Sequence, residues 1–145
     1  MRILFAFAAL FIGHSAFAAC EFEIEVGDAL TFSVSEMEVE ASCKEVSVKL
    51  THTGKMPTAA MGHNWVLSKS SEYQAVAGAG VAAGVEGNYL PSDDARVIAS
   101  TKLIGGGESD SVTFSIADLD AAESYTFYCS FPGHWAVMKG SFKIV

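Results

Sequence analysis

The sequence predicts an all-β protein, an antiparallel β-sandwich with one short helical excursion around residues 70–84. Three observations favour this class. Short segments alternate apolar and polar residues with a period of two, as half-buried strands do. Gly, Pro and Asp residues separate these segments at short intervals, which is typical of turns. Half of the 145 residues are apolar, which is enough to bury a core in a single domain.

The start of the chain is typical of a secretory signal peptide. Arg2 gives a short positive start, residues 3–12 form an apolar run too short to span a membrane, and alanines follow near a cleavage position. We expect cleavage after Ala18 or Ala19, and therefore export to the periplasm. The expected division of the chain is a signal peptide over residues 1–19 and one domain over residues 20–145.

The first half of the domain is expected to be mostly strands. Phe22, Ile24 and Val26 alternate with glutamates, which predicts a half-buried strand with an acidic outer face. Thr53-Gly54 and Pro57 are expected to end a later strand of the same kind. The extended segments expected here are residues 22–26, 30–40, 46–50 and 63–68.

One segment differs from the strands around it. Ser70 or Ser71, followed by Glu72 and an alanine-rich run, predicts a short helix outside the sheets. Three glycines in residues 78–84 weaken its helical propensity. Strands are again expected over residues 96–103, 112–116, 124–130 and 140–145.

The last two strands place a cysteine where it faces inward. Tyr125, Phe127 and Cys129 are each two residues apart, so they share one face of the predicted strand. If Phe127 packs into the core, the Cys129 thiol also points inward at the end of the strand. Tyr125 is expected to form the corner hydrogen bond that tyrosines make in sandwich folds.

The segment Cys129-Ser-Phe-Pro-Gly-His134-Trp-Ala-Val-Met138 places a thiol, an imidazole and a thioether around one Pro-Gly turn. Thiolate and imidazole suit copper or zinc, and a thioether favours copper. His63 offers a second imidazole from a distant part of the chain. Two His, one Cys and a weak axial Met are the donors of a blue-copper electron-transfer site.

These segments resemble the azurins, a family of bacterial cupredoxins. The loop from Cys129 to Met138 is similar to their copper loop, and Met61-Gly-His-Asn-Trp65-Val-Leu-Ser68 to their first-histidine segment. The resemblance runs in register from Cys20 to Val145. It implies a Greek-key, cupredoxin-like sandwich, a plastocyanin/azurin-like domain over residues 20–145. It also implies one type 1 copper per chain, cycling between Cu(I) and Cu(II) as a one-electron carrier.

The resemblance also implies the roles of individual residues. The expected copper ligands are His63, Cys129, His134, Met138 as a weak axial donor and the Gly62 carbonyl oxygen as a second one. Asn64 and the Phe131 backbone N–H are expected to donate hydrogen bonds towards the Cys129 sulfur. His52 matches a position near the site that is not a ligand, and we interpret it as a buried histidine with satisfied hydrogen bonds.

In the family, electrons leave through the edge of the second histidine, within an apolar patch. Trp135 departs from the pattern, because family members usually carry a small residue there; we expect it to change partner contacts rather than the copper. The implied partners are c-type cytochromes, nitrite reductase or amine dehydrogenases, and the protein is expected to be a monomer. The expected patch residues are Met56, Met61, Phe131, Pro132, Gly133, Trp135 and Ala136.

Three cysteines in an exported chain indicate one disulfide and one free thiol. Cys20 and Cys43 are the expected pair, which leaves Cys129 free, as a metal ligand must be. In an alternative, Cys20 is lipidated after the signal peptide. Against it, Phe17 stands where such signals usually carry Leu, and Cys43 would lose its partner.

Charge and size exclude several functions. The net charge is −8 and there is no basic patch, so nucleic-acid binding is not expected, nor is membrane insertion after cleavage of the signal. One short domain without a second copper site argues against an enzyme such as a copper nitrite reductase. Two alternatives remain: a module that stores or delivers copper, and a zinc-occupied site without a redox role.

Overall fold

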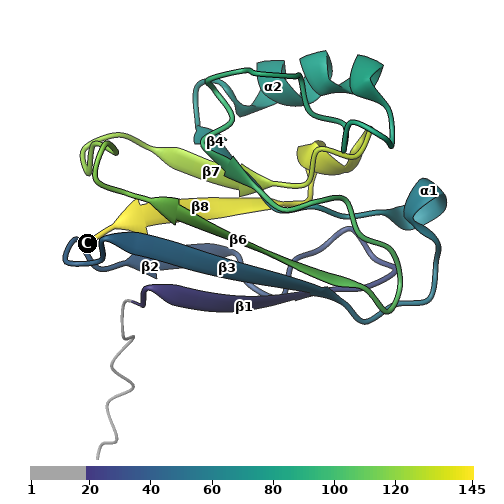
Figure 1. Ribbon diagram of the computed structural model, residues 1–145, viewed down its shortest axis with the longest axis horizontal. Coiled ribbons are helices and arrows are strands. Elements are labelled where there is room, and N and C mark those ends of the chain that lie inside the picture. Colours follow the sequence, from purple (N-terminus) through teal and green to yellow (C-terminus); the bar gives the residue numbers. More distant parts are fainter. Residues whose placement is uncertain (1–18) are drawn as a thin grey trace, which may run out of the picture.

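The computed structural model describes residues 19–145, so the expected signal peptide, apart from Ala19, lies outside the described residues. Its strands form two sheets that pack as a sandwich (Figure 1). The strands are β1 (Glu21–Val26), β2 (Glu36–Val39), β3 (Glu45–His52), β4 (Val66–Lys69), β5 (Ala99–Ser100), β6 (Ser109–Ser115), β7 (Tyr125–Tyr128) and β8 (Lys139–Ile144). The helices are α1 (Thr58–Met61) and α2 (Tyr73–Gly80), with 3-10 turns η1 (Val81–Ala83) and η2 (His134–Ala136).

The sheets contain both parallel and antiparallel neighbours. One has the order β1-β3-β6 and the other β2-β8-β7-β4-β5. β1 pairs with β3, and β2 with β8, in parallel, whereas the remaining pairs are antiparallel. Alternation along a strand tells which side chains are buried but not the direction of the neighbouring strand. The sandwich was therefore predicted from the sequence, and its parallel pairs were not.

The core lies between the sheets and follows the predicted period of two. Ile24 and Val26 are buried on β1 while its glutamates are exposed, and β3 alternates in the same way. Trp65 is completely buried, with its ring 5.9 Å from that of Phe114 and 6.2 Å from that of Phe127. Each such buried side chain stabilises the fold by about 1.5–3 kcal/mol.

Several expected elements are shorter in the structure, and one was missed. The extended segment expected over residues 30–40 contains only β2, and the strand expected over residues 96–103 is reduced to β5. The Ile98 and Thr101 N–H groups still donate to the Leu67 and Trp65 carbonyls. Side chains accept two other backbone N–H groups, because the Trp65 N–H donates to Thr101 Oγ1 and the Leu103 N–H to Asn88 Oδ1. The helix expected over residues 70–84 is the shorter α2 followed by η1. α1, which was not predicted, starts directly after Pro57.

Two further predictions concern single bonds, and both are confirmed. Tyr125 Oη accepts a hydrogen bond from the Asp120 N–H at 2.9 Å and donates to the Asp120 carbonyl at 3.2 Å, which makes the expected corner. Cys20 and Cys43 form a disulfide across a Cα–Cα distance of 5.7 Å. This pairing excludes the lipidated alternative, in which Cys43 has no partner.

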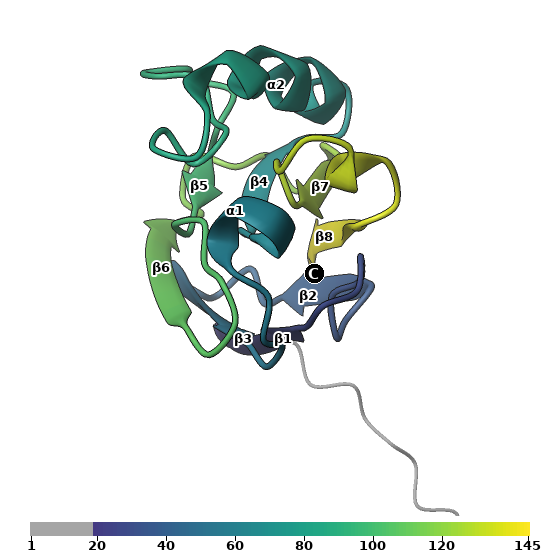
Figure 2. The same ribbon diagram turned by 90° about the vertical axis from the view of Figure 1, so that its right-hand side faces the viewer.

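The β7–β8 connection, which follows Cys129 and contains His134, lies at one end of the sandwich (Figure 1). Figure 2 looks onto this end, where α1 and the β7–β8 connection, which contains η2, face the viewer. α2 covers the outer side of the larger sheet, because its Val76 and Ala77 pack against Val66 and Tyr128. Among residues 19–145, no helix is both long and apolar enough to cross a membrane.

Candidate metal centre

The structure brings together a cysteine and two histidines from two remote places in the chain. His63, between α1 and β4, is fixed by two backbone hydrogen bonds to Ile104, of 3.0 and 2.9 Å. Cys129 follows β7, and His134 opens η2. Cys129 Sγ lies 3.7 Å from His63 Nδ1 and 3.6 Å from His134 Nδ1. All three donor atoms lie within 4.8 Å of one another, and all three residues are buried.

These separations fit one metal ion surrounded by three donors. With metal–nitrogen bonds of about 2.0 Å and a metal–sulfur bond of about 2.3 Å, donors 120° apart are separated by about 3.7 Å. Donors 90° apart would be separated by only about 3.0 Å with the same bonds. The observed 3.6 and 3.7 Å therefore match a trigonal arrangement. This donor set, with a thioether nearby in the chain, favours copper.

Hydrogen bonding orients the His63 ring for metal binding. Its Nε2 lies 2.9 Å from the Gly27 carbonyl oxygen, which can only accept, so Nε2 carries the proton. Nδ1 then presents its lone pair towards the Cys129 sulfur. Burial lowers the pKa of His63 to about 4 and also lowers the pKa of His134. Both imidazoles are thus neutral at neutral pH, the form that binds metals.

Burial also keeps the Cys129 thiol neutral in the metal-free protein. Burial raises the pKa of Cys129 to about 12, and backbone hydrogen bonds from Asn64 and Phe131 oppose this rise. In the metal-free protein the thiol therefore keeps its proton at neutral pH, and a bound metal must displace it. The two backbone groups that favour the thiolate belong to the residues expected to donate to the sulfur.

The two expected weak ligands lie beside the cysteine. The Gly62 carbonyl oxygen is 4.0 Å from Cys129 Sγ, and a Cβ on Gly62 would collide with the Thr58 carbonyl oxygen. Glycine is therefore required at position 62, where the backbone passes close to the Thr58 carbonyl oxygen. Met138 is completely buried, and its carbonyl accepts the Cys129 N–H at 3.1 Å, so the two residues are neighbours across the turn.

A buried hydrogen-bond network joins the two ligand segments. The Asn64 amide donates to Ser130 Oγ at 2.8 Å and to the Asn88 carbonyl at 3.0 Å, and accepts the Ser130 N–H at 2.8 Å. Each segment thus holds the other in place before a metal arrives. The sequence identified Asn64 but not Ser130 or Asn88, because only the position next to Cys129 distinguishes Ser130, and nothing distinguishes Asn88.

His52 lies beside the donor cluster without belonging to it. Its ring stacks on His63 at 5.1 Å, Nε2 bonds to the Met61 carbonyl at 3.0 Å, and Nδ1 accepts the Gly54 N–H at 3.1 Å. Both ring nitrogens are therefore satisfied, as expected of a structural histidine.

The surface near His134 is apolar and partly exposed. The Phe131 ring stacks on the His134 ring at 4.4 Å, and Tyr89 packs edge-on against Phe131 at 5.1 Å. Within the predicted patch, Met56, Gly133 and Ala136 are exposed, and the other members are partly exposed. A β-sandwich that holds a buried Cys and two His at metal-binding distance, near an accessible apolar surface, defines a cupredoxin-type copper protein.

Comparison with known proteins agrees with this class. Residues 18–145 match the sequence model of copper-binding proteins of the plastocyanin/azurin family. The chain therefore belongs to the plastocyanin/azurin family.

Individual relatives support the same assignment. An azurin from Achromobacter denitrificans is 54% identical over 88% of this chain and 85% of its own length. An azurin from Bordetella pertussis is 50% identical over the whole chain and 94% of its own length. The solved structure of the azurin Az-iso2 from Methylomonas sp. strain J gives a TM-score of 0.85 at 45% identity, covering 88% of this chain and 99% of its own. The family and the donor cluster together fit a single type 1 copper site.

Proposed function

We propose that this protein is a periplasmic one-electron carrier whose single type 1 copper cycles between Cu(I) and Cu(II) while it serves redox partner proteins. One observation carries the proposal: a buried thiol and two imidazole nitrogens within 4.8 Å of one another. A copper ion bound there supplies a reversible one-electron couple. The chain supplies the donors, their orientation and the exclusion of water.

The proposed ligand set combines strong and weak donors. His63, Cys129 and His134 would be the strong donors, and Met138 and the Gly62 carbonyl would be the weak ones. Cu(II) and Cu(I) prefer different geometries, so a stiff intermediate arrangement keeps rearrangement small on electron transfer. The Asn64–Ser130 network and the His63–Ile104 backbone bonds support such stiffness, since they fix both ligand segments without the metal.

The proposed route for the electron is the His134 edge. The predicted patch surrounds it with apolar groups, and such a surface suits the small, short-lived interfaces of redox encounters. We propose c-type cytochromes, a nitrite reductase or an amine dehydrogenase as partners. Electron-transfer rates measured against a panel of these proteins would identify the partner, and no exchange with any of them would contradict the proposal.

Two separate observations support the proposed compartment and the proposed cleavage site. The Cys20–Cys43 disulfide suits an oxidising compartment. The Ala19 N–H already bonds to the Glu38 carbonyl at 3.2 Å, which favours cleavage before Ala19. The intact mass of the secreted protein distinguishes cleavage after Ala18 from cleavage after Ala19, and recovery in the cytoplasm with the leader attached would contradict export.

Colour tests the metal site directly. Cu(II) added to the reduced metal-free protein should give an intense blue absorption from thiolate-to-copper charge transfer, and Cys129→Ser should abolish it. The disulfide variant Cys20→Ser/Cys43→Ser is the matched control and should stay blue. Colourless copper binding, or zinc retained against excess copper, would favour the non-redox alternative. Rapid loss of copper to a weak chelator would favour storage or delivery.

A further inference from the structure

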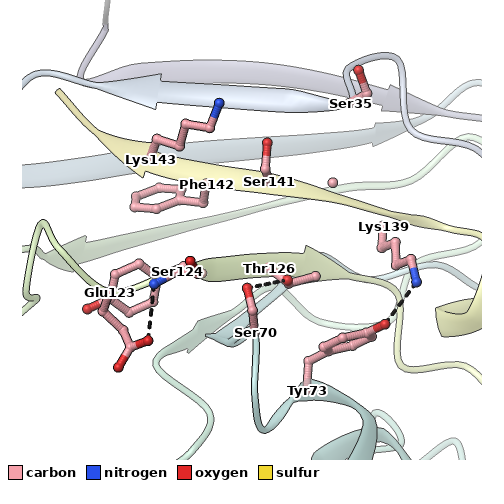
Figure 3. A pocket seen from close by; sticks show the side chains of 12 residues that line it. Ser35, Ser70, Tyr73, Glu123, Ser124, Thr126, Lys139, Ser141, Phe142 and Lys143 are labelled. Atoms are coloured by element: carbon pink, nitrogen blue, oxygen red, sulfur yellow. Dashed lines mark hydrogen bonds between the residues drawn. The ribbon is translucent and has the colours of Figure 1, made fainter.

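Tyr73, the first residue of α2, lies beside the copper loop but takes no part in the donor cluster. Figure 3 shows it at the border of an open groove of about 660 Å³ on the outer side of β7 and β8, with its hydroxyl pointing to Lys139. Only 7% of the residue is exposed. Three residues that contact Tyr73 are neighbours in the chain of the proposed metal ligands.

Three contacts of Tyr73 share one property. Its ring centroid lies 5.4 Å from that of Tyr128 and 6.3 Å from that of Trp135, in an edge-on arrangement. Its hydroxyl oxygen accepts a hydrogen bond from Lys139 Nζ at 2.8 Å. Each of these partners directly adjoins a proposed ligand in the chain. Tyr128 precedes Cys129, Trp135 follows His134, and Lys139 follows Met138.

Strand geometry explains two of the three contacts, those with Tyr128 at the end of β7 and Lys139 at the start of β8. Side chains alternate between the two faces of a strand, so a residue next to an inward-facing ligand points outward. Phe127 and Cys129 face the core, whereas Tyr128 packs with α2. Met138 is likewise buried in the core, and Lys139 is exposed on the other side. Adjacent Cα atoms are only about 3.8 Å apart, so a displaced outward residue moves the adjacent ligand.

We propose that Tyr73 is a positioning residue for the copper loop, residues 129–138, and that α2 acts through it as a support behind the ligands. The copper loop has its own backbone bonds, such as Met138 N–H to the His134 carbonyl at 2.8 Å, but these tie the loop only to itself. Tyr73 ties Trp135 within the loop, and Tyr128 and Lys139 on either side of it, to a separate element. Trp135 thereby acquires a role besides its predicted one in the patch: its ring anchors the residue after His134 to α2.

This inference rests on the proposed ligand set, and it is tested with Tyr73→Ala and Tyr73→Phe. Val46→Ala is the matched control, since Val46 is completely buried on β3 of the smaller sheet, opposite Phe114, and lies outside the α2 cluster. Backbone hydrogen exchange of the copper loop is measured in the metal-free protein. The rate of copper loss to a strong chelator and the Cu(II) hyperfine splitting are measured in the loaded protein.

Tyr73→Ala should speed both copper-loop exchange and copper loss about tenfold, because it removes two aromatic contacts. It should also alter the hyperfine splitting. Tyr73→Phe keeps the ring contacts and should stay within about threefold of the wild type, since it loses one hydrogen bond. Val46→Ala should lower the melting temperature while leaving copper-loop exchange, copper loss and the spectrum unchanged.

Two results would overturn the inference. One is that Tyr73→Ala and Val46→Ala change the copper loop equally, which would make Tyr73 an ordinary core residue. The other is that Tyr73→Phe is as impaired as Tyr73→Ala, since the ring contacts would then carry no weight. Failure of the ligand set itself would look different: the wild-type protein would not turn blue, whereas the exchange measurements on metal-free protein would still report on Tyr73.

Discussion

Two methionines in the core, Met37 and Met138, are both completely buried, yet only Met138 pairs with Cys129 across the turn. If Met138 is the proposed weak donor, Met138→Leu removes that donor and makes the site more apolar. Both changes disfavour the more highly charged Cu(II), so the reduction potential should rise while the blue colour persists. Voltammetry of this variant and of Met37→Leu, which should keep the wild-type potential, checks the axial role. Equal potentials in both variants would remove Met138 from the ligand set.

Gly62 is a second residue whose neighbourhood decides its role. Gly62→Ala would place a Cβ against the Thr58 carbonyl oxygen and the Leu103 side chain. The backbone must then shift at His63, which should lower the free energy of unfolding by about 1–3 kcal/mol and weaken the blue absorption. Gly78→Ala is the control, because a Cβ there meets nothing within 4 Å and helices favour alanine. Denaturant unfolding of the two variants should therefore give opposite changes.

Asp94 provides a pH-dependent prediction away from the metal. Hydrogen bonds from Arg96, through its side chain and its backbone, lower the pKa of Asp94 to about 2. Arg96→Met should raise this pKa towards the ordinary value of about 3.9. Because the folded-state pKa is depressed, the pair stabilises the fold above pH 4 and loses that contribution as the pH falls towards 2. An NMR titration of the carboxyl carbon measures the shift, and an unchanged pKa would contradict it.

Among individual residues, the sequence was sufficient to predict roles for those whose side-chain chemistry is typical of metal ligands. A thiol, two imidazoles and a thioether in the family's spacing identify a metal site before any coordinates. Asn88 and Tyr73 carry no such signal. Their roles depend on which segments the fold places side by side, namely the 84–94 loop against Asn64 and α2 against Trp135.

Among the elements, the disulfide offers the clearest prediction. It joins the start of β1 to the β2–β3 turn, which lie at the end of the sandwich away from the β7–β8 connection (Figure 1). Cys20→Ser/Cys43→Ser should lower the free energy of unfolding by about 3 kcal/mol, because the unfolded chain regains the freedom of a closed loop. The copper spectrum should not change. A loss of colour together with the loss of stability would show that the two ends of the sandwich are coupled.

Period-two alternation predicted the longer strands well because each buries one face. β1, β3, β6, β7 and β8 all overlap their predicted segments. It was less informative for β5, where Thr101 and Asn88 side chains accept two of the backbone N–H groups around an expected strand. It also missed α1, which is too short for a helical period to show and depends on Pro57 at its start.

The charge of the whole molecule governs its encounters. The proposed cleavage before Ala19 would remove Arg2 and no acidic residue, so the mature chain would have a net charge of about −9. Electron exchange with a basic partner should therefore slow as ionic strength rises, because screening shortens the reach of the attraction to about 10 Å at 0.1 M salt. Stopped-flow rates at two salt concentrations check this. A rate that does not respond to salt would mean that apolar contact alone brings the partners together.

The chain distance between the donors also determines when the metal can be fully bound. Cys129, His134 and Met138 stand within ten residues of one another, so they can share an ion even in an unfolded polypeptide. His63 is 66 residues away from Cys129 and joins them only after the sheets have assembled. An ion that the loop can also hold in the unfolded chain stabilises the native state by less than its full affinity. In the proposed ligand set, what copper adds to native stability therefore depends strongly on His63, the donor that only folding supplies.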